Sequence, residues 1–293
     1  MSSIVIIGAG LSGLTVARSL KEKGHETLIL EKSKGLGGRV ATRRIEDLGF
    51  DHGASFFHDS QQSRELIKGQ KLICESYKTS GIFLRGGMNQ LPKSLATGLK
   101  ILKDHRVESL RKLGADWELR TENNQTFNAE KVILTAPLPQ ALELLEKSQI
   151  GYDKNLGKVT YHKSLLALVI MKPSGSFSSL PPELTSILAM RERDLHPDGF
   201  VVRASYDFSE KHFDAPEPDI LKMLTSLIER AWTIPPQLTH IELKKWRYSQ
   251  PVFSLPVPYV QLQQSLFLIG DAFISGDSTG AVSSALSLAK KLT

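Results

Sequence analysis

The sequence has 293 residues, 41% of them hydrophobic and 23% charged, and this composition excludes a collagen-like, low-complexity or disordered chain. Its formal net charge of +6 is scattered along the chain, which favours an ordinary solvated surface, so we do not expect a nucleic-acid partner. A single cysteine, Cys74, excludes an internal disulfide, and we expect no metal cluster. The sequence has no signal-like or membrane-spanning apolar run, so we expect a cytoplasmic protein with no membrane partner.

The first 32 residues predict a strand, a tight turn, a helix and a second strand. Residues 3–7 are a short run rich in isoleucine and valine, and the apolar residues of 14–24 recur at helical spacing. Gly24 ends the helix, and residues 25–32 supply a second buried strand with Glu31 near its end. This order is a βαβ unit, which belongs to a parallel sheet with helices on its faces.

Later segments predict two further kinds of structure. Residues 106–138 contain short strands and turns, which indicate a small antiparallel ribbon, and a buried strand, a proline turn and a helix follow within 131–147. Three strand-like runs, 158–172, 185–193 and 200–208, predict a separate antiparallel sheet. The remaining expected elements are a helix at 218–232, strands at 239–249 and 265–270, and a last helix at 279–292.

Three glycines mark the turn between the first strand and the first helix. Gly8 permits the tight turn, Gly10 lets the backbone approach a pyrophosphate, and Gly13 allows the helix to pack closely. The phosphates would lie at the helix N-terminus, and Glu31 would accept hydrogen bonds from ribose hydroxyls. The pattern therefore predicts a dinucleotide site, although a glycine-rich turn without a ligand has the same spacing.

A second glycine turn follows the second strand. Residues 35–38 hold three more glycines, and Arg39 comes directly after them. A second backbone-lined anion cradle with a guanidinium beside it suits the far side of a long dinucleotide, because arginine can pair two phosphate oxygens at once. This arrangement favours FAD over a nicotinamide nucleotide as the cofactor.

Several motifs together resemble the flavin-containing amine oxidase superfamily, and most closely its renalase branch. They are GAGLSGL with Glu31, GGRVATRR followed by FDHGASFF, RGGMNQLPKSLATGL, HRVESL, VILTAPLPQALELL, KKWRYSQP and FLIGDAFISGDSTGAVSSALSLAKKL. Residues 161–243 carry no matching motif. The resemblance implies an α/β FAD-dependent oxidoreductase with a Rossmann-like, GR2-type FAD-binding domain and a second, antiparallel-sheet substrate domain.

The resemblance also implies where the two domains lie along the chain. The FAD-binding domain would be discontinuous and contain residues 1–56, 84–150 and 250–293. The substrate domain would contain residues 57–83 and 151–249.

A set of FAD-contacting residues follows from the same resemblance. Ser55 and Phe56 would lie near the isoalloxazine ring, and Asp271 would bind the ribityl or pyrophosphate portion, although a turn or N-cap role also suits it. The last helix would direct its N-terminus at the ring edge that becomes negative on reduction. The implied set is Gly8, Gly10, Leu11, Ser12, Gly13, Glu31, Lys32, Gly38, Arg39, Gly53, Ala54, Ser55, Phe56, Val107, Gly270, Asp271, Gly280, Ala281 and Val282.

No residue stands out as a catalytic base. Trp246, Tyr248 and His58 are candidates for lining the substrate site, although packing explains the two strand aromatics equally well. Monoamine oxidases attach their flavin to a cysteine near the C-terminus, and Cys74 is not near that place, so we expect non-covalent FAD. The stretch DSTGAVSSA also lacks the paired tyrosine of those enzymes.

The renalase resemblance implies oxidation of a small dihydropyridine. The substrates would be 2- or 6-dihydro isomers of NAD(P), which give a hydride to flavin N5, and O2 would then reoxidise the flavin and form hydrogen peroxide. Loss of hydride leaves an aromatic pyridinium, so no general base is required. The alternatives are oxidation of a small amine or polyamine, a desaturase or isomerase reaction on an apolar substrate, and flavin binding without turnover. The sequence does not indicate an oligomeric state.

Overall fold

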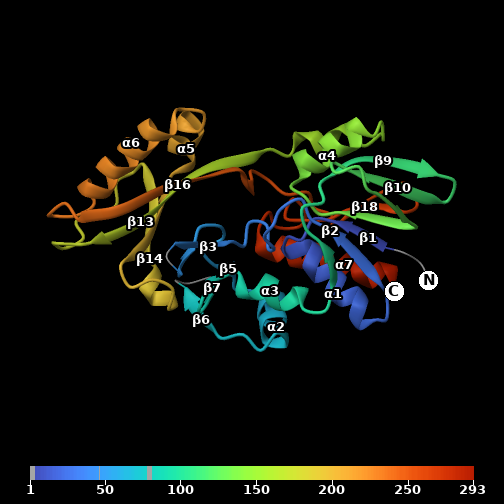
Figure 1. Cartoon of the computed structure of the whole chain (residues 1–293), viewed down its shortest axis with the longest axis horizontal. Coiled ribbons are helices and arrows are strands. Elements are labelled where there is room, and N and C mark those ends of the chain that lie inside the picture. Colours follow the sequence, from blue (N-terminus) through green and yellow to red (C-terminus); the bar gives the residue numbers. More distant parts are fainter. Residues whose placement is uncertain (1–3, 46, 78–80) are drawn as a thin grey trace.

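The computed structural model describes residues 4–45, 47–77 and 81–293, and Ser3, where the predicted first strand begins, lies outside them. Figure 1 shows a parallel sheet with helices at one end of the molecule and a long antiparallel sheet at the other. This arrangement confirms the predicted α/β class with a Rossmann-like unit and a second, antiparallel sheet.

The first sheet has six strands and combines residues from both ends of the chain. β1 (Ile4–Ile7) is central and pairs in parallel with β2 (Thr27–Leu30) and β12 (Lys131–Leu134). The outer strands are β8 (Lys100–Leu102), the parallel β18 (Leu266–Leu268) and the antiparallel edge strand β17 (Val260–Leu262). The last predicted strand therefore returns to the first sheet, as the sequence indicated.

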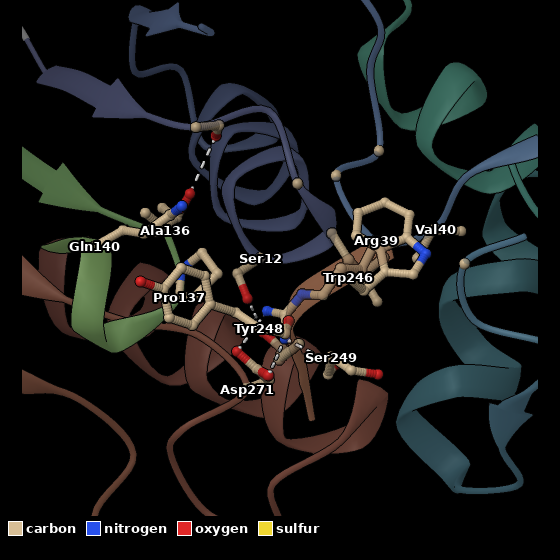
Figure 2. A pocket seen from close by; sticks show the side chains of 18 of the residues that line it. Ser12, Arg39, Val40, Ala136, Pro137, Gln140, Trp246, Tyr248, Ser249 and Asp271 are labelled. Atoms are coloured by element: carbon tan, nitrogen blue, oxygen red, sulfur yellow. Dashed lines mark hydrogen bonds and ion pairs between the residues drawn. The ribbon is translucent and has the colours of Figure 1, made fainter. Parts of the chain in front are cut away.

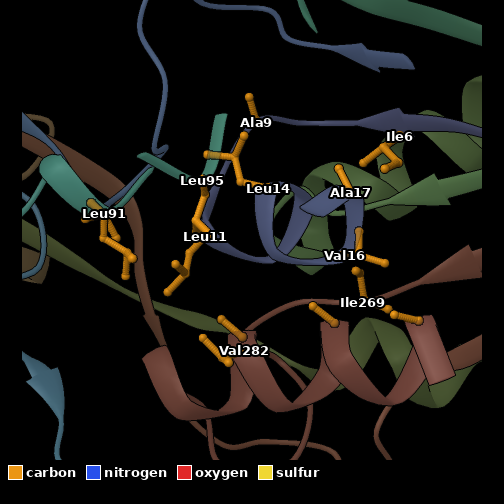
Figure 3. Packing of buried hydrophobic residues seen from close by; sticks show 14 of the residues in the cluster. Ile6, Ala9, Leu11, Leu14, Val16, Ala17, Leu91, Leu95, Ile269 and Val282 are labelled. Carbon is orange, nitrogen blue, oxygen red and sulfur yellow. The ribbon is translucent and has the colours of Figure 1, made fainter. Parts of the chain in front are cut away.

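Two helices cover one face of this sheet. α1 (Leu11–Glu22) packs against α7 (Ser278–Leu292), and α3 (Gln90–Ala96) lies beside α1. Leu14, Val16 and Val282 are buried in their common core, as Figure 3 shows. A Cβ on Gly13 would lie 2.0 Å from the carbonyl oxygen of Gly8. The helix α1 therefore packs so closely on the preceding turn that only glycine fits at position 13.

The opposite face carries a second core cluster. Its elements are α4 (Leu138–Lys147) and the antiparallel ribbon of β9 (Val107–Leu113), β10 (Asp116–Thr121) and β11 (Thr126–Ala129). Trp117 is fully buried there together with Val132 of the sheet. The ribbon turns at Gly114 and Asn124, and both residues have positive φ, +58° and +59°.

The second sheet is entirely antiparallel, in the order β14-β15-β13-β16. Its strands are β14 (Leu184–Ala189), β15 (Gly199–Ala204), β13 (Tyr161–Lys172) and β16 (Gln237–Pro251). One face packs on α5 (Tyr206–His212) and α6 (Glu217–Arg230). The other face packs Leu166, Leu168 and Val201 against Phe50 of the first half of the chain.

Two predicted strand runs end earlier than the sequence indicated. The run 185–193 leaves the strand after Ala189 and continues as the 3-10 helix η2 (Met190–Arg193). The run 200–208 ends at Ala204, because Ser205 caps α5 by accepting a hydrogen bond from the backbone N–H of Phe208 at 3.2 Å. A second short 3-10 helix, η1 (Lys154–Lys158), precedes β13.

Residues 42–84 form small elements that the sequence did not predict. They are β3 (Thr42–Ile45), β4 (Leu48–Asp51), β5 (Phe57–His58), α2 (Gln61–Gly69), β6 (Cys74–Tyr77) and β7 (Gly81–Leu84). Phe57, Ile67 and Ile82 share the core cluster of α1 and α7, whereas the antiparallel sheet has clusters of its own. We therefore propose that residues 57–77 and 81–83 group with the six-stranded sheet, whereas the resemblance implied that they belong to the substrate domain.

A buried ion pair joins the two halves of the molecule. Arg193 Nη1 lies 3.3 Å from Asp51 Oδ2, and the two side chains are 3% and 1% exposed. Asp51 Oδ1 also accepts hydrogen bonds from Thr42 Oγ1 at 2.6 Å and from the backbone N–H of Met88 at 3.0 Å. Burial raises the pKa of Asp51, and the Thr42 hydrogen bond and the Arg193 charge oppose that rise.

Candidate active site

A cavity of about 950 Å³ runs from the carboxyl ends of the parallel strands to the antiparallel sheet. What we call the Glu31 end is lined by Glu31, Lys32, His105, Arg106, Val107, Gln140, Glu143 and Lys147. What we call the Arg203 end is lined by Gly53, Ala54, Ser55, Phe56, His58, Arg203, Tyr206, Trp246 and Gln250. The two glycine turns and Asp271 line the part between them. The volume suits a large ligand.

Glu31 holds the first glycine turn in shape. Its two carboxylate oxygens accept hydrogen bonds from the backbone N–H groups of Ala9 and Ser33, both at 2.7 Å. The side chain is 7% exposed and lines the cavity. The sequence predicted a role for Glu31 toward a ribose but gave no signal for these two bonds. Each oxygen keeps acceptor capacity for a ligand hydroxyl.

The two glycine turns lie side by side. Gly37 donates its backbone N–H to the carbonyl oxygen of Ala9 at 2.8 Å, and Gly10 and Gly37 form a β-bridge. Gly8 and Gly38 have φ of +110° and +57°, which side-chain-bearing residues rarely adopt. The backbone of two adjacent turns thus lines one section of the cavity, which is an arrangement suited to a pyrophosphate.

Arg39 and Asp271 bind each other in the middle of the cavity wall, as Figure 2 shows. Two parallel hydrogen bonds of 2.6 and 2.7 Å join the guanidinium to the carboxylate. Arg39 Nη1 also donates to the carbonyl oxygens of Tyr248 and Ser249, each at 3.2 Å. Tyr161 donates its hydroxyl to Asp271 Oδ1 at 3.2 Å. The sequence indicated that Arg39 and Asp271 each face a ligand, but not that they pair.

Arg39 keeps its positive charge inside the protein. Burial by itself lowers the pKa of Arg39, but the Asp271 carboxylate and then Tyr161 more than offset this, so the pKa is raised overall. Burial, followed by the charge of Asp271, raises the pKa of Tyr161, which therefore remains a neutral hydroxyl. The pair joins the second glycine turn to β16 and to the end of the last strand, and its charges cancel locally.

The Arg203 end is built where the antiparallel sheet meets residues 53–58. Arg203 Nη2 donates to the carbonyl oxygen of Gly53 at 2.6 Å and lies 3.4 Å from Ser55 Oγ. Its Nη1 donates to Ser164 Oγ at 3.1 Å. Sequence reasoning missed Arg203 because its region matched no motif. The signal was an arginine inside the apolar run FVVRA.

Aromatic side chains complete the same wall. Trp246 donates its indole N–H to the carbonyl oxygen of His52 at 2.8 Å, and the two rings stack 5.5 Å apart at an angle of 17°. Tyr206 donates its hydroxyl to Gln250 Oε1 at 2.9 Å. Trp246 and Tyr248 therefore line the cavity as the sequence suggested, and Trp246 is fixed in one orientation.

The start of α7 differs from the expected geometry. Asp277 caps this helix, since its Oδ1 accepts hydrogen bonds from the backbone N–H groups of Thr279 at 2.7 Å and Gly280 at 3.0 Å. His58 Nδ1 lies 3.4 Å from Asp277 Oδ2. The N–H of Gly280, which was expected to face the ring of the cofactor, is thus engaged by a carboxylate of the chain itself. Ala281 does line the cavity.

Four residues of the expected FAD set lie outside the cavity wall, namely Gly13, Gly270, Gly280 and Val282. Gly13 and Val282 pack between α1, α7 and the first turn. Gly270 donates its N–H to Ser284 Oγ at 3.2 Å, and a Cβ on Gly280 would lie 2.5 Å from the carbonyl oxygen of Phe273. The structure brings the rest of the expected set together around the cavity.

In the described part of the chain, no group of three or more His, Cys, Asp or Glu side chains is placed to hold a metal ion. Within the same residues, the helices are too short or too polar to cross a bilayer.

His52 makes the stability of the protein depend on pH. Burial, followed by repulsion from Lys244, lowers the pKa of His52 to about 4, against an ordinary value of 6.5. As the pH is lowered below 6.5, the imidazole of His52 takes up a proton in the unfolded chain before it does so in the folded chain. The free energy of unfolding therefore falls between pH 6.5 and about pH 4. The shift corresponds to at most about 3 kcal/mol.

We expect His52→Gln to lose this part of the pH dependence. Urea unfolding at pH 7.5, 6 and 5 should show a smaller fall in the free energy of unfolding than in the unmodified protein. The matched control is His212→Gln on α5, which should keep the original fall. Parallel curves for His52→Gln and the unmodified protein would contradict the assignment.

Comparison with known proteins places this architecture in a family. Residues 6–68 match the NAD(P)-binding Rossmann-like domain, and residues 63–287 match the flavin containing amine oxidoreductase family. Renalase of Mus musculus is 24% identical over 100% of this chain and 99% of its own length. Polyamine oxidase 2 of Arabidopsis thaliana is 27% identical over 43% of this chain, but over only 29% of its own length.

A solved structure shows the same fold. An oxidoreductase from Methanosarcina mazei superposes with a TM-score of 0.74 over 98% of this chain and 100% of its own, at 13% sequence identity.

Proposed function

Since this chain belongs to the flavin-containing amine oxidoreductase family and is an FAD-dependent oxidoreductase, we propose that it oxidises small dihydropyridines, namely 2- or 6-dihydro isomers of NAD(P), with O2 as the acceptor. FAD would supply the acceptor for the hydride and the route by which two electrons reach O2, and O2 would take up two protons as well and leave as hydrogen peroxide. The chain's own residues bind the cofactor, orient the donor and set the charge around both.

The residues of the cavity fit FAD. A Cβ on Gly10 would meet no protein atom within 4 Å, although Gly10 lines the cavity between the two glycine turns. This is the space that a pyrophosphate needs beside backbone N–H groups. We assign Glu31 to the ribose hydroxyls, the Glu31 end to the adenine, and the Arg203 end to the isoalloxazine ring. Cys74 does not line the cavity, which supports non-covalent binding.

The charge at the Arg203 end is the observation that supports a dihydropyridine dinucleotide over an amine. Arg203 lines this part of the cavity, and Arg247, which also lines the cavity, is 55% exposed and lies 3.4 Å from Asp214. Asp271 and Asp277 also line the cavity, but they are engaged by Arg39 and by the N-terminus of α7. A donor that carries phosphates meets complementary charge there, whereas a protonated amine meets like charge.

The oxidation of a dihydropyridine also requires little of the side chains that line the cavity. It becomes an aromatic pyridinium when it loses a hydride, so the site needs no residue to remove a proton. Trp246, held by its hydrogen bond to His52 and by ring stacking, presents a fixed planar surface for such a ring.

The test is an anaerobic donor screen with the FAD-loaded protein. The 2- and 6-dihydro isomers of NAD and NADP should bleach the flavin absorbance when they are mixed with the protein in the absence of oxygen. Air should then restore the absorbance, with formation of hydrogen peroxide. Benzylamine and spermine should leave the absorbance unchanged. Bleaching by an amine but by neither dihydro isomer would establish amine oxidation in place of the proposed reaction.

A further inference from the structure

A glutamine at the Arg203 end of the cavity keeps hydrogen-bonding capacity for a ligand. Gln250 lies near the end of β16 and lines the cavity. Its Oε1 accepts a hydrogen bond from the hydroxyl of Tyr206 at 2.9 Å and can accept a second one. Among the residues that the structure describes, its Nε2 group has no acceptor for its two hydrogens. One side chain therefore offers a donor and an acceptor next to each other.

Two aromatic residues hold this glutamine in place, although Gln250 itself is exposed. Tyr206 begins α5, and its ring stacks on the ring of His162, with the ring centres 4.0 Å apart and an angle of 6° between the planes. His162 is the residue of β13 that pairs with Gln250 across the strands. Burial raises the pKa of Tyr206, so its hydroxyl stays protonated and remains a donor. The amide of Gln250 is thus oriented before a ligand binds.

Two neighbouring polar side chains of the same wall are engaged elsewhere. Trp246 uses its one N–H group for the carbonyl oxygen of His52, at 2.8 Å. His58 Nδ1 lies 3.4 Å from a carboxylate oxygen of Asp277. Trp246 therefore offers a ligand its ring surface, whereas Gln250 can pair with a carbonyl oxygen and an N–H group of one ligand.

A primary carboxamide matches this arrangement, because it also carries one carbonyl oxygen and one NH2 group. Two primary amides can pair through two N–H···O hydrogen bonds, one in each direction. We infer that Gln250 binds the carboxamide group of the dihydronicotinamide donor and that Tyr206 positions Gln250 for this pairing. The inference rests on the proposed function and names a specificity residue of that site. A protonated amine has no acceptor, so it would use only the oxygen of Gln250.

Binding of oxidised nucleotides to the FAD-loaded protein tests the pairing without turnover. NAD+ carries the carboxamide, whereas 3-acetylpyridine adenine dinucleotide has the same charge and the same carbonyl group but a methyl group in place of NH2. We expect calorimetric titration to give a dissociation constant at least about fivefold lower for NAD+, because the analogue lacks one hydrogen bond to Gln250. Equal dissociation constants for the two nucleotides would contradict the pairing.

Gln250→Met removes the amide with little change in the size of the side chain. This variant should bind NAD+ about tenfold more weakly, and the ratio of the two dissociation constants should fall to about one. Tyr206→Phe keeps the stacked ring but frees the amide, and it should lower the same ratio to about half. The matched control is Gln261→Met on β17, an exposed glutamine that does not line the cavity, and it should change neither constant.

The donor screen and these titrations separate the two ways of being wrong. If the dihydro isomers bleach the flavin but Gln250→Met keeps the ratio of the unmodified protein, the assignment of Gln250 is overturned and the proposed function stands. If neither isomer bleaches the flavin and NAD+ does not bind to the FAD-loaded protein, the proposed function fails and the carboxamide site fails with it. Bleaching by the isomers together with a lowered ratio in Gln250→Met supports both.

Discussion

Replacing Gly10 by alanine is expected to weaken FAD binding about hundredfold, which is about 2.7 kcal/mol, and to leave the unfolding temperature of the FAD-free protein unchanged. The FAD-free protein has room for the methyl group, because a Cβ on Gly10 meets nothing within 4 Å, and its φ of −77° is open to any residue. The methyl group would instead occupy the space assigned to the pyrophosphate. Fluorescence titration with FAD and thermal unfolding of the apoprotein measure the two effects separately.

Two other glycines make this prediction specific. A Cβ on Gly35 also meets nothing, and Gly35 does not line the cavity, so Gly35→Ala should change neither FAD affinity nor unfolding temperature. Gly13→Ala should destabilise the apoprotein itself, since its Cβ would lie 2.0 Å from the Gly8 carbonyl oxygen. Normal FAD binding by Gly10→Ala would show that the pyrophosphate lies elsewhere.

Replacing Arg193 by methionine is expected to lower the free energy of unfolding by about 3–5 kcal/mol. The variant leaves the carboxylate of Asp51 buried, at 1% exposure, without the guanidinium that faces it at 3.3 Å. The hydrogen bonds from Thr42 and Met88 remain, but they do not replace the lost charge. Urea unfolding at pH 7 measures the loss, and Arg111→Met, which breaks an exposed pair with Glu118, should cost less than about 1 kcal/mol.

The pH dependence of this variant has a definite sign. The pKa of Asp51 is already raised in the folded protein, so folding favours the protonated carboxyl group. The stabilisation that comes from this protonation is lost as the pH rises. Removal of Arg193 raises that pKa further, and the deficit of Arg193→Met should therefore shrink as the pH is lowered from 7 to 5. The double variant Asp51→Asn with Arg193→Met should recover much of the stability at pH 7. Equal deficits at both pH values, without recovery in the double variant, would show that lost packing dominates.

The parts of the fold that the sequence predicted are those with a strong local pattern. The first βαβ unit, the ribbon beyond residue 105, the long strands β13 and β16 and the helix α6 all show clear periodicity or apolar runs, and all are present. The hairpin of β3 and β4 was not predicted. β3 reads TRRI, with two exposed arginines and no alternation that a half-buried strand requires.

The candidate site was predictable where a tight turn or the open space beside it favours glycine, and less so where side chains meet across the fold. Gly8, Gly10 and Gly38 are recognisable because turns and phosphate approach leave a compositional signal. The pairing of Arg39 with Asp271 spans 232 positions of sequence and leaves none. Arg203 was missed because its position in the cavity wall depends on β15 lying beside residues 53–55. A single sequence carries no recognisable sign of that contact.

The strand order of the six-stranded sheet also has a consequence for biosynthesis. β1 is made first, but its neighbour β12 and the next strand, β18, are separated from it by more than a hundred residues, and Asp271 and Ala281 close the cavity from the extreme end of the chain. A nascent polypeptide still missing its last two dozen residues therefore has no complete seat for FAD. FAD can therefore bind in full only after Ala281 has been made and folded into place, and until then the emerging protein lacks the stabilisation that a bound ligand provides.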